Sequence, residues 1–110
     1  MHVLVVYVPA THLETVKEAV FAAGAGHYEN YDSCCWQVLG QGQFRPLEGS
    51  DPHIGAHGRI ETVDEYRVEL VCRDNVLPDV LRALIAAHPY EEPAYAAWPI
   101  LTIRDFPVAD

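Results

Sequence analysis

The chain has 110 residues, half of them apolar, and this length and composition predict a single globular domain with a hydrophobic core. Seven basic residues stand against 16 acidic ones, so the formal net charge is −9 with neutral histidines. Nucleic-acid binders must neutralise phosphates, and proteins that dock on anionic membranes need a cationic patch. The charge therefore argues against nucleic acid and membrane as partners.

The three cysteines are Cys34, Cys35 and Cys72, and their spacing contains no C-x-x-C pair. This excludes a zinc knuckle and a thioredoxin-type site, and we interpret the thiols as small hydrophobic groups. The apolar run 3–8 is too short to cross a bilayer and lacks the features of a secretion signal. We therefore expect a cytoplasmic protein with reduced cysteines.

Two strands and one helix are predicted in the first part of the chain. The β-branched run 3–8 indicates a strand. Thr11 and Glu14 fit a capping box for a helix with regularly spaced apolar residues, and Gly24 provides its stop signal. Residues 28–39 alternate less regularly and indicate a second strand.

The second part is likewise predicted as a strand, a helix and a strand. Residues 60–73 alternate between apolar and charged, which is typical of an antiparallel strand with one solvated face. A helix follows over 75–87, with Asn75 as its N-cap. The last strand, over 95–103, contains Pro99 and is therefore expected at a sheet edge or a bulge.

The order β-α-β-β-α-β predicts an α+β, ferredoxin-like split βαβ domain over 1–110. In this arrangement an antiparallel sheet carries two helices on one face, and its other face is left for a partner or solvent. Trp36, Trp98 and Phe44 exceed what two short helices can cover. Burial of such a face by a second copy is the usual solution, so we predict a homo-oligomer.

A long glycine-rich loop is predicted at about 40–59, and it holds five of the seven glycines. Its apolar residues favour an ordered loop that packs on the domain or on a neighbouring subunit. Gly42 and Gly55 are expected to shape it through positive φ angles. A phosphate-binding loop is excluded, because no helix begins after Gly40-x-Gly42 and no Gly-Lys-Ser/Thr is present.

His53 and His57 have the spacing of a helical zinc pair. Glycines at 55 and 58 argue against a helix there, so surface histidines are the favoured interpretation.

The segment 88–95 carries the most informative residues. His88 continues the apolar stripe of the preceding helix and is expected to be buried, with one ring nitrogen bonded locally, where it can cap the last helical carbonyls. A histidine beside Glu91 and Glu92 also suits a divalent cation, so these three residues form a candidate metal site. Structural capping explains the same residues without a ligand and is favoured.

A series of motifs follows a fixed order along nearly the whole chain. It comprises Ala22-Ala23-Gly24-Ala25-Gly26, Tyr31, Cys35-Trp36, Gly40-x-Gly42-x-Phe44-Arg45-Pro46, Glu48-Gly49-Ser50-x-Pro52-x-Ile54-Gly55, Glu65-Tyr66-Arg67-Val68-Glu69 and His88-Pro89-Tyr90-Glu91-Glu92-Pro93-Ala94-Tyr95. The series resembles the CutA/PII-like insert domain of Nif-three-like (YqfO-type) proteins, in the form found alone in short bacterial homologues.

The resemblance implies a domain related in shape to the PII signalling proteins and the CutA cation-tolerance proteins, which assemble as trimers. A trimer is therefore favoured over a dimer. In full-length family members a flanking domain binds the two metal ions, and we expect this chain to lack that domain. The resemblance thus implies a non-catalytic, homo-oligomeric binding or regulatory module. A CutA-like divalent-metal-binding protein is the alternative, and a small metal-dependent hydrolase comes third.

The binding or interface site is expected in a pocket at a subunit boundary, where the long loop meets the segment 88–95. Its predicted residues are Gly40, Gly42, Phe44, Arg45, Pro46, Glu48, Gly55, His88, Tyr90, Glu91 and Glu92. No catalytic residue is predicted, and no cofactor other than a divalent metal ion at His88, Glu91 and Glu92 is considered. The sequence names neither a small-molecule ligand nor a protein partner.

Overall fold

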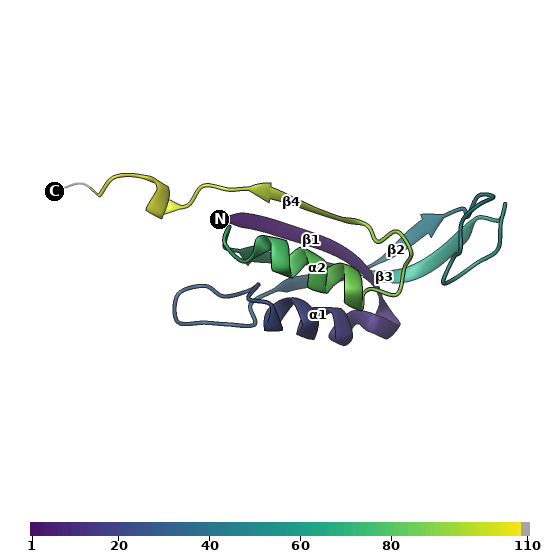
Figure 1. The fold of residues 1–110 in the computed structure, drawn as a ribbon, viewed down its shortest axis with the longest axis horizontal. Coiled ribbons are helices and arrows are strands. Elements are labelled where there is room, and N and C mark those ends of the chain that lie inside the picture. Colours follow the sequence, from purple (N-terminus) through teal and green to yellow (C-terminus); the bar gives the residue numbers. More distant parts are fainter. Residues whose placement is uncertain (109–110) are drawn as a thin grey trace.

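The computed structural model describes residues 1–108 and confirms the predicted α+β class. Its elements in chain order are β1 (His2–Pro9), the 3₁₀ turn η1 (Ala10–His12), α1 (Leu13–Ala22), β2 (Trp36–Phe44), β3 (Glu61–Cys72), α2 (Leu77–Ala87), β4 (Tyr95–Pro99) and the 3₁₀ turn η2 (Ile103–Asp105). Both helices lie on one face of a single sheet (Figure 1).

The sheet has the strand order β2-β3-β1-β4, and all its neighbouring strands are antiparallel. β1 lies between β3 and β4, with His2 opposite Cys72 and Pro9 opposite Glu65. β4 is an edge strand and Pro99 is its last residue, which confirms the edge position predicted from that proline.

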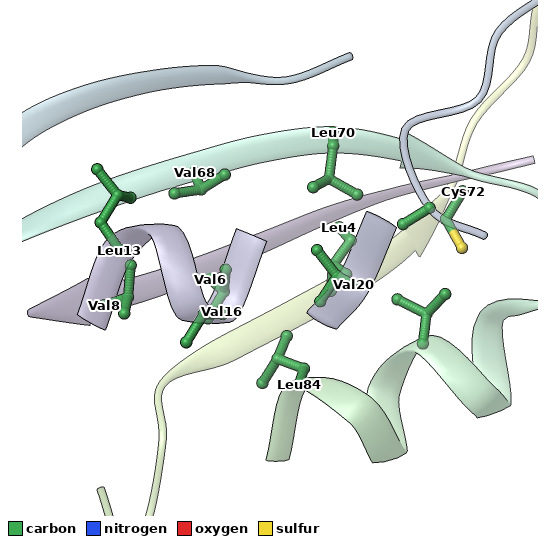
Figure 2. Packing of buried hydrophobic residues seen from close by; sticks show 12 residues of the cluster. Leu4, Val6, Val8, Leu13, Val16, Val20, Val68, Leu70, Cys72 and Leu84 are labelled. Carbon is green, nitrogen blue, oxygen red and sulfur yellow. The ribbon is translucent and has the colours of Figure 1, made fainter. Parts of the chain in front are cut away.

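The core lies between the sheet and the two helices (Figure 2). Alternate residues of β1 and β3 face the helices, as the alternation predicts, and the helices contribute residues at helical spacing. The buried members are Leu4, Val6, Val8, Leu13, Val16, Val20, Ala25, Val68, Leu70, Cys72, Val80 and Leu84.

The predicted C-terminal stop of α1 is confirmed, because Gly24 adopts a positive φ of 112°. The amides of Gly24 and Ala25 donate to the carbonyls of Phe21 and Val20, which is the pattern of a Schellman motif. The predicted N-caps are wrong. Thr11 lies in the turn η1, where its Oγ1 is 2.8 Å from His12 Nδ1, and no side chain caps α1. The cap of α2 is Val76, and Asn75 precedes it without capping.

The second strand is displaced along the chain relative to the prediction. β2 begins at Trp36, and residues 28–35 lie outside the sheet. Tyr28 and Tyr31 form an isolated bridge with each other. The strand continues to Phe44 because β3 is long enough to pair with it to Glu61. Gly40 and Gly42 are therefore strand residues, and the loop runs over 45–60 rather than 40–59. β4 ends at Pro99, short of the predicted residue 103.

The second face of the sheet carries no helix within residues 1–108 (Figure 1). Trp36 and Val38 of β2, Tyr7 of β1 and Trp98 of β4 are exposed large side chains, and the strand registers place all four on this open face. None of the helices in the described part of the chain has the length and apolar character that a bilayer crossing requires.

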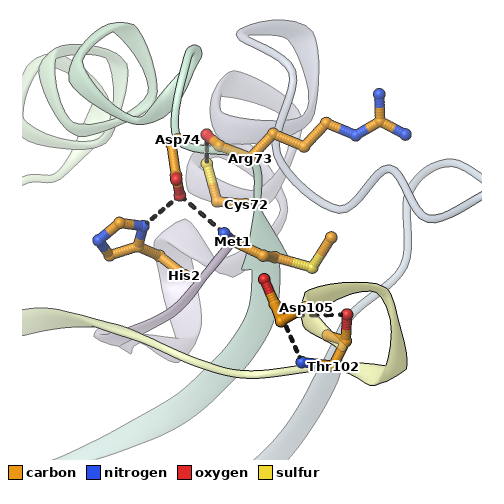
Figure 3. Close-up of polar contacts among 7 residues, drawn as sticks. All are labelled: Met1, His2, Cys72, Arg73, Asp74, Thr102 and Asp105. Atoms are coloured by element: carbon orange, nitrogen blue, oxygen red, sulfur yellow. Dashed lines mark hydrogen bonds and ion pairs between the residues drawn. The ribbon is translucent and has the colours of Figure 1, made fainter. Parts of the chain in front are cut away.

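Polar contacts join the beginning of β1 to the end of β3 (Figure 3). The Met1 amino group and His2 Nδ1 lie 2.8 Å and 2.7 Å from Asp74 Oδ1. The hydrogen bonds from the amino terminus and from His2 lower the pKa of the Asp74 carboxyl. The other end of β1 lies at Pro9, where the chain enters η1 and α1.

Candidate functional site

A cavity of about 430 Å³ lies where the loop 45–60 meets the segment that connects α2 to β4. Its lining consists of Gln43, Phe44, Arg45, Pro46, Leu47, Ser50, Pro52, His53, Ile54, Glu65, Tyr90, Glu91, Glu92 and Ala94. Folding thus brings together the two segments from which the sequence predicts a site, within one chain. Of the predicted residues, Gly40, Gly42, Glu48, Gly55 and His88 do not line the cavity.

Hydrogen bonds hold the loop in place on its own domain. The Asp51 amide donates to Glu91 Oε2 at 3.0 Å, which links the loop directly to the connecting segment. Inside the loop, the Gly58 amide donates to the Pro46 carbonyl at 2.7 Å, and Pro46 is buried. The loop therefore packs on its own domain, and Glu91 contributes to one wall of the cavity.

His88 is 6% exposed and does not line the cavity, but it is hydrogen-bonded to Tyr90, which does. Its Nε2 donates to the Tyr7 carbonyl at 2.7 Å, and the Tyr90 amide donates to Nδ1 at 3.1 Å. These partners select the neutral tautomer with the proton on Nε2. Burial lowers the pKa of His88, although the Tyr7 carbonyl and the Glu65 carboxylate act in the opposite direction.

The structure confirms one prediction about His88 and contradicts another. Its burial and local bonding are confirmed, but the ring binds a carbonyl of β1 and does not cap the carbonyls of α2. Both ring nitrogens are occupied, so the structure does not assemble His88 with Glu91 and Glu92 as a ligand set. Within residues 1–108, no group of three or more His, Cys, Asp or Glu side chains is arranged to hold a metal ion.

His53 and His57, the other histidine pair, have different partners in the structure. His57 Nε2 donates to the Ser50 carbonyl at 2.8 Å inside the loop. His53 lines the cavity, and its ring lies edge-on to His12 with 5.6 Å between the centroids.

The Tyr90 ring is the aromatic centre of the cavity. Its centroid lies 6.2 Å from that of Phe44, 6.3 Å from that of His53 and 4.8 Å from that of His88. The hydroxyl oxygen is buried beside the Glu65 carboxylate. Burial raises the pKa of the Tyr90 phenol, and Glu65 raises it further, through a hydrogen bond with the phenol and through its negative charge.

Glu65 is a site residue that the sequence analysis missed. It lies in β3 opposite Gly40, and its carboxyl crosses the backbone of β2 at Gly42. A Cβ atom at Gly42 would lie 1.8 Å from Glu65 Oε1, so the glycine makes room for this side chain. The prediction of a positive φ is thus wrong for Gly42, whereas Gly55 adopts φ 95° as predicted.

No family model matches the chain. The sequence is 52% identical over 91 residues to the GTP cyclohydrolase 1 type 2 homolog of Mycobacterium leprae (strain TN), a match that covers 83% of this chain and 24% of the relative. The chain spans about a quarter of the length of the curated relatives it matches.

Two solved structures have the same fold as this chain. A Bacillus cereus protein related to NIF3 matches with a TM-score of 0.77 and 40% identity, over 90% of this chain and 25% of the other. The periplasmic divalent cation tolerance protein CutA from Archaeoglobus fulgidus matches with a TM-score of 0.64 and 19% identity, over 91% and 84%, and shows a common fold alone. The chain is thus similar in sequence and in fold to one quarter of a NIF3-related protein, and it shares its fold with CutA.

Proposed function

We propose that the chain is a non-catalytic, self-associating module that binds a small ligand in the cavity between the loop 45–60 and the α2–β4 connection. The observation that carries this proposal is the cavity itself, whose two sides are joined by the Asp51–Glu91 hydrogen bond. Its lining is mainly apolar, with a few polar groups that converge on one space, which is typical of ligand sites of about 300–1,000 Å³.

The absence of catalysis is part of the proposal and rests on the lining. Ser50 is the only hydroxyl nucleophile among the described lining residues besides the Tyr90 phenol, and its Oγ donates to the Leu47 carbonyl rather than to a base. The cyclohydrolase name belongs to longer relatives, and this chain matches only about a quarter of each. Within residues 1–108, no cluster of metal-ligating side chains supports a metal-binding or metal-dependent hydrolytic function.

Self-association is supported by the open face of the sheet, where Trp36 and Trp98 are 59% and 42% exposed. Two exposed tryptophans on one face are unusual for a monomer, because large apolar patches generally mark interfaces. We place the module in the cytoplasm and assign it a trimeric state.

The test is a nuclear magnetic resonance screen of the isotope-labelled chain against a fragment library with equal numbers of neutral, anionic and cationic members. We expect at least one fragment to shift the backbone amides of residues 50–54 and 90–94 together. Phe44→Ala should abolish this binding because the ring lines the cavity, and Val38→Ala on the same strand should not. If no fragment of the library shifts these two groups of amides together, the proposed function is contradicted.

A further inference from the structure

We propose that the ligand is an organic cation, in which a protonated amine or guanidinium is attached to an apolar body. This inference rests on the proposed function of the cavity and specifies its ligand class. Three properties of the lining lead to it: the balance of charge, the aromatic wall and a buried hydroxyl beside a carboxylate.

The charge of the lining is the first property. Glu65, Glu91 and Glu92 face the same space, and Arg45 is the one cationic side chain of the described lining. Neither Glu65 nor Glu92 forms an ion pair within residues 1–108, so their charges are not compensated there. The net charge of −9 adds a long-range field that attracts cations and repels anions.

The aromatic wall is the second property. The Phe44 and Tyr90 rings are inclined by 50° with their centroids 6.2 Å apart, and both line the cavity. An ammonium or guanidinium group is attracted to such ring faces, and the attraction grows as water is excluded. Pro46, Leu47 and Ile54 complete an apolar surface that suits the hydrocarbon part of an organic cation better than a hydrated metal ion.

The third property is the Tyr90 hydroxyl. Its oxygen is buried beside the Glu65 carboxylate, and burial together with this carboxylate keeps the phenol neutral. A phenol whose O–H points toward Glu65 keeps its oxygen lone pairs free to accept, so a ligand N–H can donate to this oxygen. The same donor can reach toward the Glu65 carboxylate, whereas an anionic ligand would meet that carboxylate with like charge.

The experiment compares three probes that share one apolar body. Phenethylammonium, phenethyl alcohol and 3-phenylpropionate are titrated into the labelled wild-type chain, and the amide shifts of residues 50–54 and 90–94 are followed. Charge-assisted hydrogen bonds are about twice as strong as neutral ones, so the ammonium should bind at least about tenfold more tightly than the alcohol. The carboxylate should bind least, and added salt should weaken the binding of the ammonium alone.

Substitutions test the assignment of the partner groups. Glu65→Gln should weaken phenethylammonium binding at least about tenfold, whereas Asp64→Asn removes the same charge from the neighbouring, exposed position and should leave binding unchanged. Tyr90→Phe keeps the ring and removes the oxygen, so it should weaken binding by about fivefold. This second variant decides the question if Glu65→Gln fails to fold.

The outcomes separate this inference from the proposed function. Equal binding of the alcohol, or tighter binding of 3-phenylpropionate, would overturn the cationic ligand class while the cavity remained a ligand site. Equal loss in Glu65→Gln and Asp64→Asn would also overturn it, because the effect would then be one of overall charge. If none of the three probes binds, the cationic class is refuted, and the fragment screen decides whether the proposed function falls with it.

Discussion

The His88 ring joins two parts of the chain that are 81 residues apart, because its Nε2 donates to the carbonyl of Tyr7. Its other nitrogen accepts from the Tyr90 amide and so fixes the start of the segment that lines the cavity. The neutral ring is needed for both bonds, since a protonated imidazole has no acceptor. The position of Tyr90 thus depends on the protonation state of a residue outside the cavity.

This dependence predicts a loss of stability in mild acid. Burial holds the pKa of folded His88 below its ordinary value of 6.5, so the unfolded chain takes up the proton first as the pH falls. The contribution of His88 is complete above pH 6.5 and declines below it, through the folded pKa. Urea unfolding should show that the free energy of unfolding of the wild type falls between about pH 7.5 and about pH 5.5. The fall should be about 1 kcal/mol smaller in His88→Gln, because glutamine does not titrate.

The control for this measurement is His57→Gln, which removes an exposed loop histidine and should keep the wild-type pH dependence. The same pH dependence in His88→Gln and wild type would show that another group, such as His12 or His53, causes it.

Sequence reasoning found six of the 14 residues that line the cavity, and Glu65 is among those that it missed. Phe44, Tyr90 and Glu91 belong to motifs with unusual composition, so they could be predicted from the chain alone. Glu65 looks like any charged residue on the solvated face of an alternating strand. Only the register of β2 against β3, with Gly40 opposite it, shows that it has room to turn toward the cavity. Register depends on long-range pairing and is not visible locally.

At the scale of elements, periodicity predicted the order of strands and helices correctly, but boundaries failed where the local signal was weak. The Gly-Gln repeat at 40–43 has no apolar alternation, and it forms a strand only because β3 offers it a partner. The capping box at Thr11 failed because the chain leaves β1 through a 3₁₀ turn that includes this residue. In both cases tertiary geometry prevailed over a local preference.

The two glycines that shape the site should respond differently to substitution. Gly55→Ala should cost about 1 kcal/mol or more, because Gly55 has φ 95° and a Cβ would lie 2.5 Å from Glu61 Cγ. Gly42→Ala should cost less stability, because its Cβ meets the flexible end of Glu65, but it should displace that carboxyl and reduce cation binding.

Gly40→Ala is the matched control, because a Cβ there meets only the Glu65 carbonyl at an ordinary 3.9 Å. The free energies of unfolding in urea give the stability effects, and phenethylammonium titration gives the binding effects. Full stability of Gly55→Ala would contradict a need for positive φ in the loop.

The whole molecule is elongated, with principal extents of 62 × 24 × 22 Å. Its radius of gyration is 16.1 Å, compared with about 13 Å for a compact chain of this length. The end of the β2–β3 pair projects at one end and the segment after β4 at the other (Figure 1). Such projections and the open face leave an isolated copy with little burial for its size, which is consistent with the proposed assembly.

Replacement of the two exposed tryptophans should dissociate the assembly. Light scattering of the wild type at tens of micromolar should give about three times the chain mass of 12.3 kDa, and Trp36→Ser with Trp98→Ser should give the mass of one chain. The fold should persist, because both residues lie on the face away from the core, and circular dichroism checks this. Tyr31→Ser changes a still more exposed aromatic residue outside the sheet and should leave the mass unchanged. A wild-type mass of 12.3 kDa would contradict self-association.

The central place of β1 has a consequence for biosynthesis. This strand precedes both of its neighbours in the chain, and β3 and β4 end only at Cys72 and Pro99. The apolar residues of β1 therefore stay without a strand partner until β3 has left the exit tunnel, and they gain the second partner only when β4 follows. A strand made before both of its partners has to wait for them, so the nascent chain is most prone to aggregate before β3 is complete.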